Sequence, residues 1–342
     1  MGETSFVKVQ EDLEFAIEAT RLLGIQAERV EAYRRFLGTF GQTIEPGKTC
    51  WDVYPALPVE AFRTDRVWAG ESGVDPDYFE TSGTTDEVRG RHWFTDLAPY
   101  RASVVAGWRR FMPEVEGHAW ASLIPSVQDR PHSSLAWMVQ ILTEEIGSGR
   151  AVPVFVDRDF ALDVEGFGAW LRESEGRNVL LLATTFAVAA WCEAWRAREG
   201  ERFRLGAKSV LFETGGFKGR GRELSEDEFL GLLQEVLGLE PNQVWNEYGM
   251  TEMFSQGYRR RDELVHRVPP WVRVRMRDPV TGEVCREGER GLIEVVDLAN
   301  RESVAALATR DVGMMRGDGF VLLGRVVGAE PRGCSLPFGK VR

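Results

Sequence analysis

Three short segments carry side chains of the kinds that bind nucleotides. Thr81–Thr85 reads TSGTT, in which hydroxyls and backbone N–H groups around a glycine can face one anion, such as the phosphates of a nucleotide. Tyr248–Glu252 follows a predicted strand, where Glu252 could coordinate a Mg²⁺ ion that bridges phosphates. Asp311 could accept hydrogen bonds from ribose hydroxyls, and Arg325 could donate to a ribose or phosphate oxygen. Taken singly, these segments are also compatible with a polar turn, a solvated glutamate and a surface ion pair.

The composition excludes several classes of protein. The chain has 342 residues, 43% of them apolar, so it can bury a large core and is not mainly disordered. Its 53 acidic side chains against 42 lysines and arginines give a net charge of −11, which argues against broad binding to nucleic acid or anionic membranes. The 4 cysteines form no CxxC pair and the 4 histidines lack ligand spacing, which predicts neither a disulfide scaffold nor a metal-centred enzyme.

No segment has the pattern of a membrane span or a secretion signal. The longest apolar stretch, Val179–Cys192, is shorter than the roughly 20 residues that a span requires. The N-terminus has no basic region followed by an apolar one. We therefore expect a cytoplasmic protein with reduced thiols and no membrane span.

Apolar runs alternate with helical patterns through the middle of the chain. Because short apolar strands separated by helices form parallel sheets covered on both faces, we expect an α/β fold of layered, mostly parallel sheets with flanking helices. The predicted strands are Ala119–Pro125, Val152–Val156, Val179–Ala183, Ser209–Glu213 and Gln243–Asn246, and the predicted helices are Leu135–Glu145, Asp163–Leu171, Phe186–Arg196 and Ser225–Leu237. Two more helices are expected near the N-terminus, the first with Leu13, Ile17, Thr20 and Leu23 on one face.

The pattern changes after Met253, where short strands and turns predict a smaller β-rich C-terminal subdomain. Its expected strands are Val272–Met276, Leu292–Val296, Ala305–Ala308 and Phe320–Leu323. We therefore expect an N-terminal helical segment and connector over residues 1–75, an α/β core over 76–258, and the β-rich subdomain over 259–342.

The order and spacing of the three segments resemble the adenylate-forming superfamily of acyl-CoA synthetases, peptide-synthetase adenylation domains and luciferases, over roughly residues 75–326. A closer resemblance, covering nearly the whole chain, is to the LuxE-type acyl-protein synthetases. It is carried by Leu57–Phe62, Thr81–Thr85, Arg91-His92, Asp96-Leu97, Ile124–Ser126, Ser133–Leu135 with Met138, Glu213–Lys218, Tyr248–Glu252, Ser255-Gln256 and Arg332–Leu336.

This resemblance implies activation of a fatty or aromatic acid by ATP as an acyl-adenylate, with Mg²⁺ as a cofactor. In the LuxE family a cysteine near the C-terminus accepts the acyl group and passes it to a partner reductase, and Cys334 stands at the matching place. Two alternatives stay open. One is a stand-alone ligase that delivers the acyl group to coenzyme A, a carrier-protein pantetheine or an amine. The other is a non-catalytic relative that only binds a nucleotide or an acyl group.

The resemblance also assigns roles to residues. Thr81, Ser82, Gly83, Thr84 and Thr85 would hold the β- and γ-phosphates, Glu252 the metal, and Asp311 and Arg325 the ribose. Gly215 and Gly216 would let the backbone approach the adenine, Tyr248 beside Gly249 would stack on it, and Thr251 would bond to the α-phosphate. His92 would orient the phosphate loop or the acyl carboxylate, or else be a structural histidine.

The sequence departs from the superfamily in two respects. Asp86 and Glu87 stand where a glycine and then a lysine usually follow the phosphate loop, and two carboxylates beside a triphosphate are unfavourable. The residues after Arg325 are too few for the usual C-terminal domain with its catalytic lysine, so no separate C-terminal domain is expected. Lys218 is the candidate for the missing cation, with a solvated surface lysine as the alternative.

Overall fold

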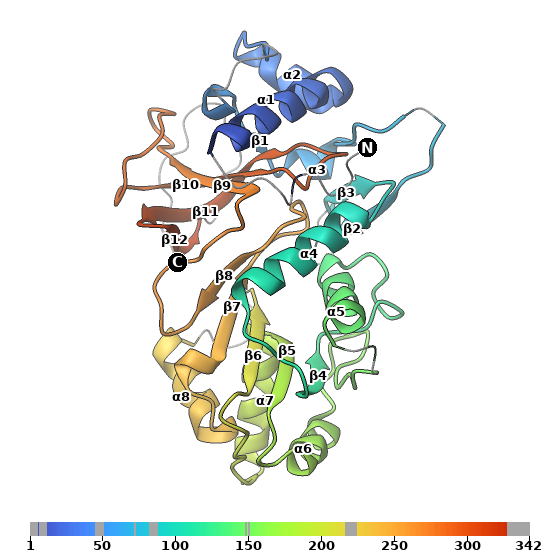
Figure 1. Ribbon diagram of the computed structural model, residues 1–342, viewed down its shortest axis with the longest axis vertical. Helices are drawn as coiled ribbons and strands as arrows, with labels where there is room; N and C mark the ends of the chain where they lie inside the picture. The colour runs from blue at the N-terminus through green and yellow to red at the C-terminus, as the bar shows by residue number, and fades with distance from the viewer. Residues whose placement is uncertain are drawn as a thin grey trace. The chain divides into compact units, whose positions relative to one another are not determined.

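The computed structural model describes residues 6, 12–44, 51–71, 73–81, 88–147, 149, 151–215 and 224–326, and these residues form two compact units (Figure 1). The first unit holds the described residues up to Arg110, Met250–Gln256 and those from Val265 onward. The second holds Phe111–Gly249, where described, and Gly257–Leu264. The three-part division expected from the sequence stays a prediction.

The second unit is built on a five-stranded sheet in the order β4-β5-β6-β7-β8. Its strands are β4 (Ala119–Leu123), β5 (Val179–Thr184), β6 (Val210–Thr214), β7 (Val244–Tyr248) and β8 (Gly257–Arg260). Neighbours from β4 to β7 are parallel and β8 is antiparallel to β7. Buried parallel strands are apolar along their whole length, and β5 has the sequence VLLLAT with its first five residues buried. The expected α/β fold with a mostly parallel sheet is confirmed here.

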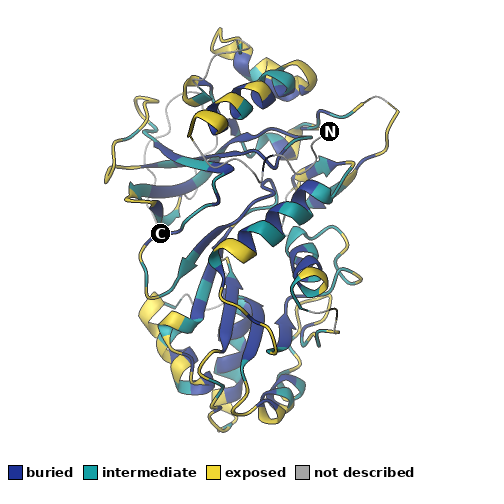
Figure 2. Cartoon of the chain, viewed as in Figure 1, coloured by how far each residue is buried: buried dark blue, intermediate teal, exposed yellow. Residues whose placement is uncertain are grey.

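Helices cover this sheet and complete its core. They are α5 (Ser134–Glu145), α6 (Val164–Glu173), α7 (Thr185–Ala197) and α8 (Glu226–Leu237). One buried cluster joins the sheet to α6, α7 and α8 through Phe167, Trp191, Trp195 and Phe229. In Figure 2, β5 and β6 have the colour of buried residues over most of their length. Polar residues fix where these helices start, since the side chain of Thr184 accepts a hydrogen bond from Ala187 N and that of Asp163 from Gly166 N.

The strand expected at Val152–Val156 is wrong. Val154 and Val156 form only isolated bridges, to Ser122 and Leu162. Pro153 directly precedes Val154 and has no N–H to donate, so the segment bonds to β4 only through Pro153 O and the N–H of Phe155, both at Ser122.

The first unit contains a second five-stranded sheet in the order β1-β11-β10-β9, with β12 also paired to β11. Its strands are β1 (Leu57–Pro58), β9 (Val272–Arg277), β10 (Arg290–Asp297), β11 (Ala306–Arg316) and β12 (Gly319–Arg325). All pairs are antiparallel except β1 with β11. The C-terminal strands therefore form the expected β-rich region, and it also incorporates a strand from the N-terminal part of the chain.

The remaining elements of this unit are α1 (Asp12–Arg29), α2 (Glu31–Thr39), α3 (Ala61–Thr64), β2 (Asp77–Glu80), β3 (Arg91–Phe94) and α4 (Ala98–Phe111), which ends at the boundary with the second unit. Strands β2 and β3 form a two-stranded antiparallel sheet. Helix α4 was not predicted, because Pro99 and Gly107 weaken the helical pattern, although proline is tolerated in a first turn. None of the described helices is long and apolar enough to cross a bilayer.

The apolar face expected on α1 is only partly correct. Thr20 and Leu23 are buried, but Leu13 is 62% exposed and Ile17 is 52% exposed. The helix instead buries a stripe with Phe15, Ala19, Leu22 and Gln26. A buried glutamine is accommodated only when its amide is hydrogen-bonded, so this orientation depends on partners far away in the sequence.

Ser225 allows a test of how much a helix cap stabilises the second unit. Its hydroxyl accepts from Glu228 N at 3.2 Å, and Ser225 N donates to the Glu228 carboxylate at 2.8 Å, which closes a capping box on α8. Ser225→Ala should lower the free energy of unfolding by about 1 kcal/mol, whereas Ser225→Asp should keep the cap and lose little. Urea denaturation measures both, and equal losses would rule out a capping role.

Candidate active site

The segment Met250–Gln256 is held in the first unit by a buried carboxylate. Asp297, at the end of β10, is completely buried. It accepts hydrogen bonds from Phe254 N at 3.0 Å, from Ser255 N at 2.8 Å and from the Ser255 hydroxyl at 2.7 Å. It also accepts from Ala299 N at 2.9 Å. Burial raises the pKa of Asp297, and these hydrogen bonds oppose that rise.

Asn300 completes this attachment three residues later. Its amide nitrogen donates to Glu252 O at 2.8 Å and its amide oxygen lies 2.9 Å from Phe254 N. Asn300 is fixed in turn by α1, because Gln26 donates to Asn300 O at 2.6 Å and accepts from Ala305 N at 2.9 Å. The backbone on both sides of Glu252 is thus satisfied by buried side chains, which leaves the segment little freedom.

His92 on β3 holds the same segment from another element. Its Nδ1 lies 2.8 Å from Thr251 O and its Nε2 lies 2.8 Å from the Ser303 hydroxyl. A carbonyl can only accept, so Nδ1 carries the proton and Nε2 accepts from Ser303. Burial lowers the pKa of His92 to about 4, so the ring is neutral at physiological pH. The structure therefore gives His92 the bonding of a positioning residue for Thr251.

Glu252 lies in a setting that disfavours its negative charge. The residue is only 8% exposed, and burial raises the pKa of its carboxyl from 4.5 to about 7. The charges of Arg325 and Arg63 oppose this rise, while that of Glu60 adds to it. A cation supplied by a ligand would stabilise the ionised form. No group of three or more metal-binding side chains occurs among the described residues. Mg²⁺ is commonly held by one or two carboxylates, with phosphate and water oxygens as its other ligands.

Asp311 and Arg325 are neighbours, as expected for two groups that act together. They are register partners on β11 and β12, and the guanidinium donates from Nε to Oδ1 at 2.7 Å. The Asp311 side chain is 9% exposed and that of Arg325 is 56% exposed. Such a pair can present donors and acceptors to a diol, and it also fits the ion pair that was the alternative.

The two candidate adenine contacts lie at the carboxyl ends of neighbouring strands in the second unit. Tyr248 ends β7 and is buried, and Gly249 follows it. A Cβ on Gly249 would lie 2.0 Å from a carboxylate oxygen of Glu247, so a larger residue there would displace that side chain. Gly215 follows β6 with φ 81°, a conformation that favours glycine.

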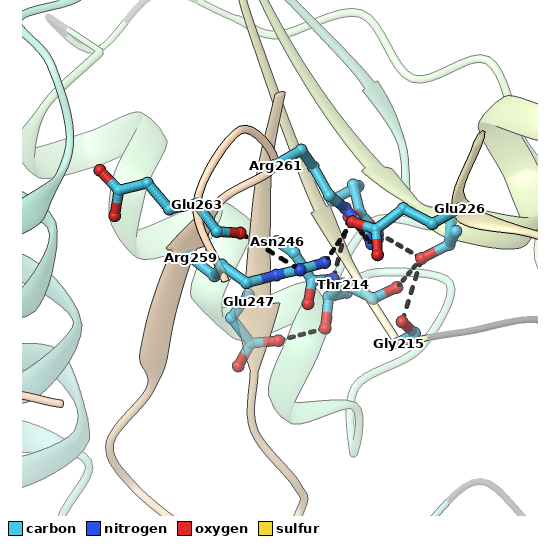
Figure 3. Close-up of polar contacts among 10 residues, drawn as sticks. Thr214, Gly215, Glu226, Asn246, Glu247, Arg259, Arg261 and Glu263 are labelled. Atoms are coloured by element: carbon cyan, nitrogen blue, oxygen red, sulfur yellow. Dashed lines mark hydrogen bonds and ion pairs between the residues drawn. The ribbon is translucent and has the colours of Figure 1, made fainter. Parts of the chain in front are cut away.

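A buried polar cluster supports this strand end (Figure 3). Glu213, on β6, is fully buried and accepts from Asn246 at 2.9 Å and from the guanidinium of Arg261, with Nε at 2.9 Å. The hydroxyl of Thr185 also donates to Glu213 and lies 3.1 Å from Gly215 O. Glu226 pairs with both Arg261 and Arg259. This network neutralises the buried carboxylate and fixes the backbone that precedes the predicted glycine pair.

Comparison with known proteins shows which family part of this chain resembles. Residues 172–340 match the model of "Acyl-protein synthetase, LuxE", a region that contains the Glu213 cluster, Glu252, Asp297 and Asp311. This stretch, just under half of the chain, is similar to the LuxE acyl-protein synthetases. The chain is also 27% identical over 175 residues to a long-chain-fatty-acid–luciferin-component ligase of Vibrio harveyi, an alignment that covers 48% of this chain and 45% of that ligase.

Solved structures share the fold. A 2-hydroxyisobutyryl-CoA ligase, in an open conformation with 2-HIB-AMP and CoA, superimposes with a TM-score of 0.65 at 14% identity, covering 92% of this chain and 70% of the ligase. ATP-bound MatB from Rhodopseudomonas palustris gives a TM-score of 0.50 at 17% identity, covering 72% of this chain and 47% of MatB. The chain therefore has the fold of adenylate-forming ligases.

Several predicted LuxE-type site residues lie outside the described residues. These are Ser82, Gly83, Thr84, Thr85, Gly216, Lys218 and Cys334, together with Asp86 and Glu87. Thr81 is described, and it closes the β2–β3 hairpin. Thr81 N donates to Gly90 O, and the Thr81 hydroxyl accepts from Gly90 N, both at 2.9 Å. The predicted phosphate loop thus begins at a hydrogen-bonded hairpin end.

Sequence reasoning missed Asp297, Asn300 and the role of Glu213. The available signal was an acidic residue inside an apolar run, as in VVDLAN and VLFET, where a buried polar side chain must be hydrogen-bonded. That signal identifies the residue but not its partners. Phe254 and Asp297 are 43 residues apart, and no local pattern connects them.

Glu252 should make stability depend on pH. Its pKa is about 7 in the folded protein against an ordinary value of 4.5, so between these values the folded state binds more protons than the unfolded state. Its contribution to stability therefore falls as the pH rises from about 4.5 to above 7. Glu252→Gln should be more stable than wild type at pH 8, by about 1–3 kcal/mol, and no more stable at pH 5. Urea titrations at both pH values measure this, and a gain that does not grow with pH would contradict it.

The stability of the protein should depend much more on the Asp297 carboxylate than on an exposed one. Asp297→Asn turns an NH₂ group toward donors that need an acceptor, so we expect a loss of about 3 kcal/mol in the free energy of unfolding. Asp12→Asn removes a carboxylate whose side chain is 95% exposed and should change stability by less than about 0.5 kcal/mol. Comparable losses in the two variants would show that the Asp297 hydrogen bonds contribute little.

Proposed function

We propose that this chain activates a carboxylic acid with ATP and then transfers the acyl group to a thiol. In the first step a carboxylate oxygen attacks the α-phosphorus, the bond to the leaving pyrophosphate breaks, and an acyl-adenylate forms. In the second step a thiolate attacks the acyl carbon and AMP leaves. A fatty acid is the first substrate to test, because the curated relative is named as a long-chain-fatty-acid ligase.

The observation that supports this proposal most strongly is the LuxE family match over residues 172–340. The match includes the segment that the Asp297 and Asn300 bonds fix around Glu252. Because the aligned region spans less than half of the curated relative, the activity, substrate and acceptor are proposals.

The proposed site residues can offset the electrostatic repulsion that opposes the first step. ATP and a carboxylate are both anions, so the site must offset their repulsion with fixed donors and cations. Mg²⁺, when bound, would neutralise phosphate charge, and Glu252 is the residue proposed to hold it. Thr251, whose backbone is fixed by His92, is the proposed donor to the α-phosphate, and Asp311 with Arg325 would bind the ribose. Lys218 is the proposed cation for the transition state.

Exchange of labelled pyrophosphate into ATP tests the first step without needing the acceptor. We expect exchange with one class of acid in a panel of fatty and aromatic acids, and its dependence on Mg²⁺. Glu252→Gln should reduce the rate by about 100-fold, the scale of removing one fixed electrostatic group. Binding of ATP without exchange for any acid would instead favour the non-catalytic alternative.

The acyl acceptor is a separate question, with Cys334 as the proposed thiol. A neighbouring cation, Arg332, favours the nucleophilic thiolate, and a reducing, cytoplasmic location would keep it free. The alternatives are coenzyme A, a carrier-protein pantetheine and an amine.

With ATP, Mg²⁺ and the acid that supports exchange, the wild type should acquire an acyl group that neutral hydroxylamine removes. Cys334→Ser should abolish this label and keep pyrophosphate exchange, because a hydroxyl without an adjacent base is a poor nucleophile. Cys285→Ser is the matched control, since burial raises the pKa of that thiol and it should carry no label. Brisk exchange with no label in the wild type would favour a diffusible acceptor.

A further inference from the structure

A basic pocket of about 600 Å³ lies in the first unit, and none of the roles above uses it. Its lining includes four arginines, Arg63, Arg66, Arg89 and Arg91, and two carboxylates, Asp65 and Glu80. The whole chain has a net charge of −11, so a pocket with an excess of arginine is a local exception. Concave surfaces of one sign focus the electrostatic field and concentrate ions of the opposite sign.

The two carboxylates of the lining do not neutralise the four guanidinium groups. Asp65 forms an ion pair with Arg35, which is not part of the lining. Glu80 is shared, at 2.8 Å from Arg89 and 3.6 Å from Arg91. Arg66 makes no ion pair with any carboxylate in the described part of the chain. Its charge is therefore available to an anionic ligand.

Aromatic rings hold two of the four guanidinium groups in place, those of Arg66 and Arg91. The Cζ of Arg66 lies 4.7 Å from the ring centre of Trp68 and 4.9 Å from that of Trp93. Arg91 lies 4.8 Å from the ring centre of Tyr78. Stacking leaves the edges of a guanidinium, where its N–H donors lie, free to bind oxygen atoms. Such a preorganised fork matches the paired oxygens of a phosphate.

The pocket borders the segment that carries Thr251 and Glu252. Phe62 in the lining packs edge-on against His92 at 5.6 Å, and His92 bonds to Thr251 O. The positive charge of Arg63 acts on the Glu252 carboxylate. Glu80 and Arg91 are register partners where β2 ends and β3 begins, next to Thr81. All of these residues belong to the first unit.

We propose that this arginine pocket binds a polyphosphate, the terminal phosphates of ATP before the reaction and pyrophosphate after it. The assignment to ATP rests on the proposed function, whereas binding of a polyphosphate anion does not. The pocket would supply cationic groups that Asp86 and Glu87 do not supply at the positions of the superfamily's glycine and lysine.

Calorimetric titration of the full chain with sodium pyrophosphate tests the binding directly, without turnover. We expect pyrophosphate to bind, and its affinity to fall as the salt concentration rises. Arg66→Gln should lower this affinity about tenfold, because it removes a charged hydrogen-bonding group. Arg29→Gln is the matched control, because it removes an exposed arginine of the same unit outside the lining and should leave the affinity unchanged. Arg89→Gln, on an exposed side chain, provides a second test if Arg66→Gln does not fold.

Competition experiments identify the source of the phosphates. ATP should displace pyrophosphate, and coenzyme A should not. Equal affinities of wild type and both pocket variants, or no pyrophosphate binding to the wild type, would overturn the proposal. Displacement by coenzyme A alone would assign the pocket to the phosphates of that acceptor and overturn the assignment to ATP. Pyrophosphate binding that needs Arg66 in a protein without exchange activity would refute the proposed function and leave the pocket as a polyphosphate site.

Discussion

The structure of the candidate site depends on one buried carboxylate, that of Asp297. It is completely buried and accepts from three backbone N–H groups and one hydroxyl, two of the N–H groups belonging to Phe254 and Ser255. Without this acceptor, those groups would be buried without partners, which costs more than the hydrogen bonds themselves contribute. The segment that bears Thr251 and Glu252 is therefore positioned from β10. Asn300 and Gln26 extend the same network to α1 and to Ala305.

Each unit contains such a carboxylate, but the two are neutralised in different ways. Glu213 faces the guanidinium of Arg261, and the charge pair offsets the cost of burial. Asp297 has mainly N–H and hydroxyl donors around it, and burial raises its pKa. Its charge is thus stabilised by dipoles alone, which demands fixed geometry.

The sequence predicted features that depend on local patterns. The apolar runs of β5 and β6 and the four helices of the second unit agree with their predicted positions, because hydrophobic periodicity and caps such as Ser225 are local. It failed where a distant partner decides the outcome. The face of α1 follows Gln26 and its bonds to Asn300 O and Ala305 N. For the same reason Glu252 and the Asp311–Arg325 pair could be named from motifs, whereas Asp297 could not.

Burial of Glu252 links the stability of the first unit to its chemistry. A carboxylate that is 8% exposed and has a raised pKa is a poor choice for stability, since an apolar side chain would avoid the desolvation cost. The same desolvation strengthens its attraction for a cation, because a charge with few water molecules around it interacts more strongly with its partner. The surrounding backbone is held by Asp297, Asn300 and His92, so the position from which the Glu252 side chain extends is fixed. The fixed segment thus keeps a carboxyl group in a setting that disfavours its charge, and strongly perturbed pKa values cluster at functional sites.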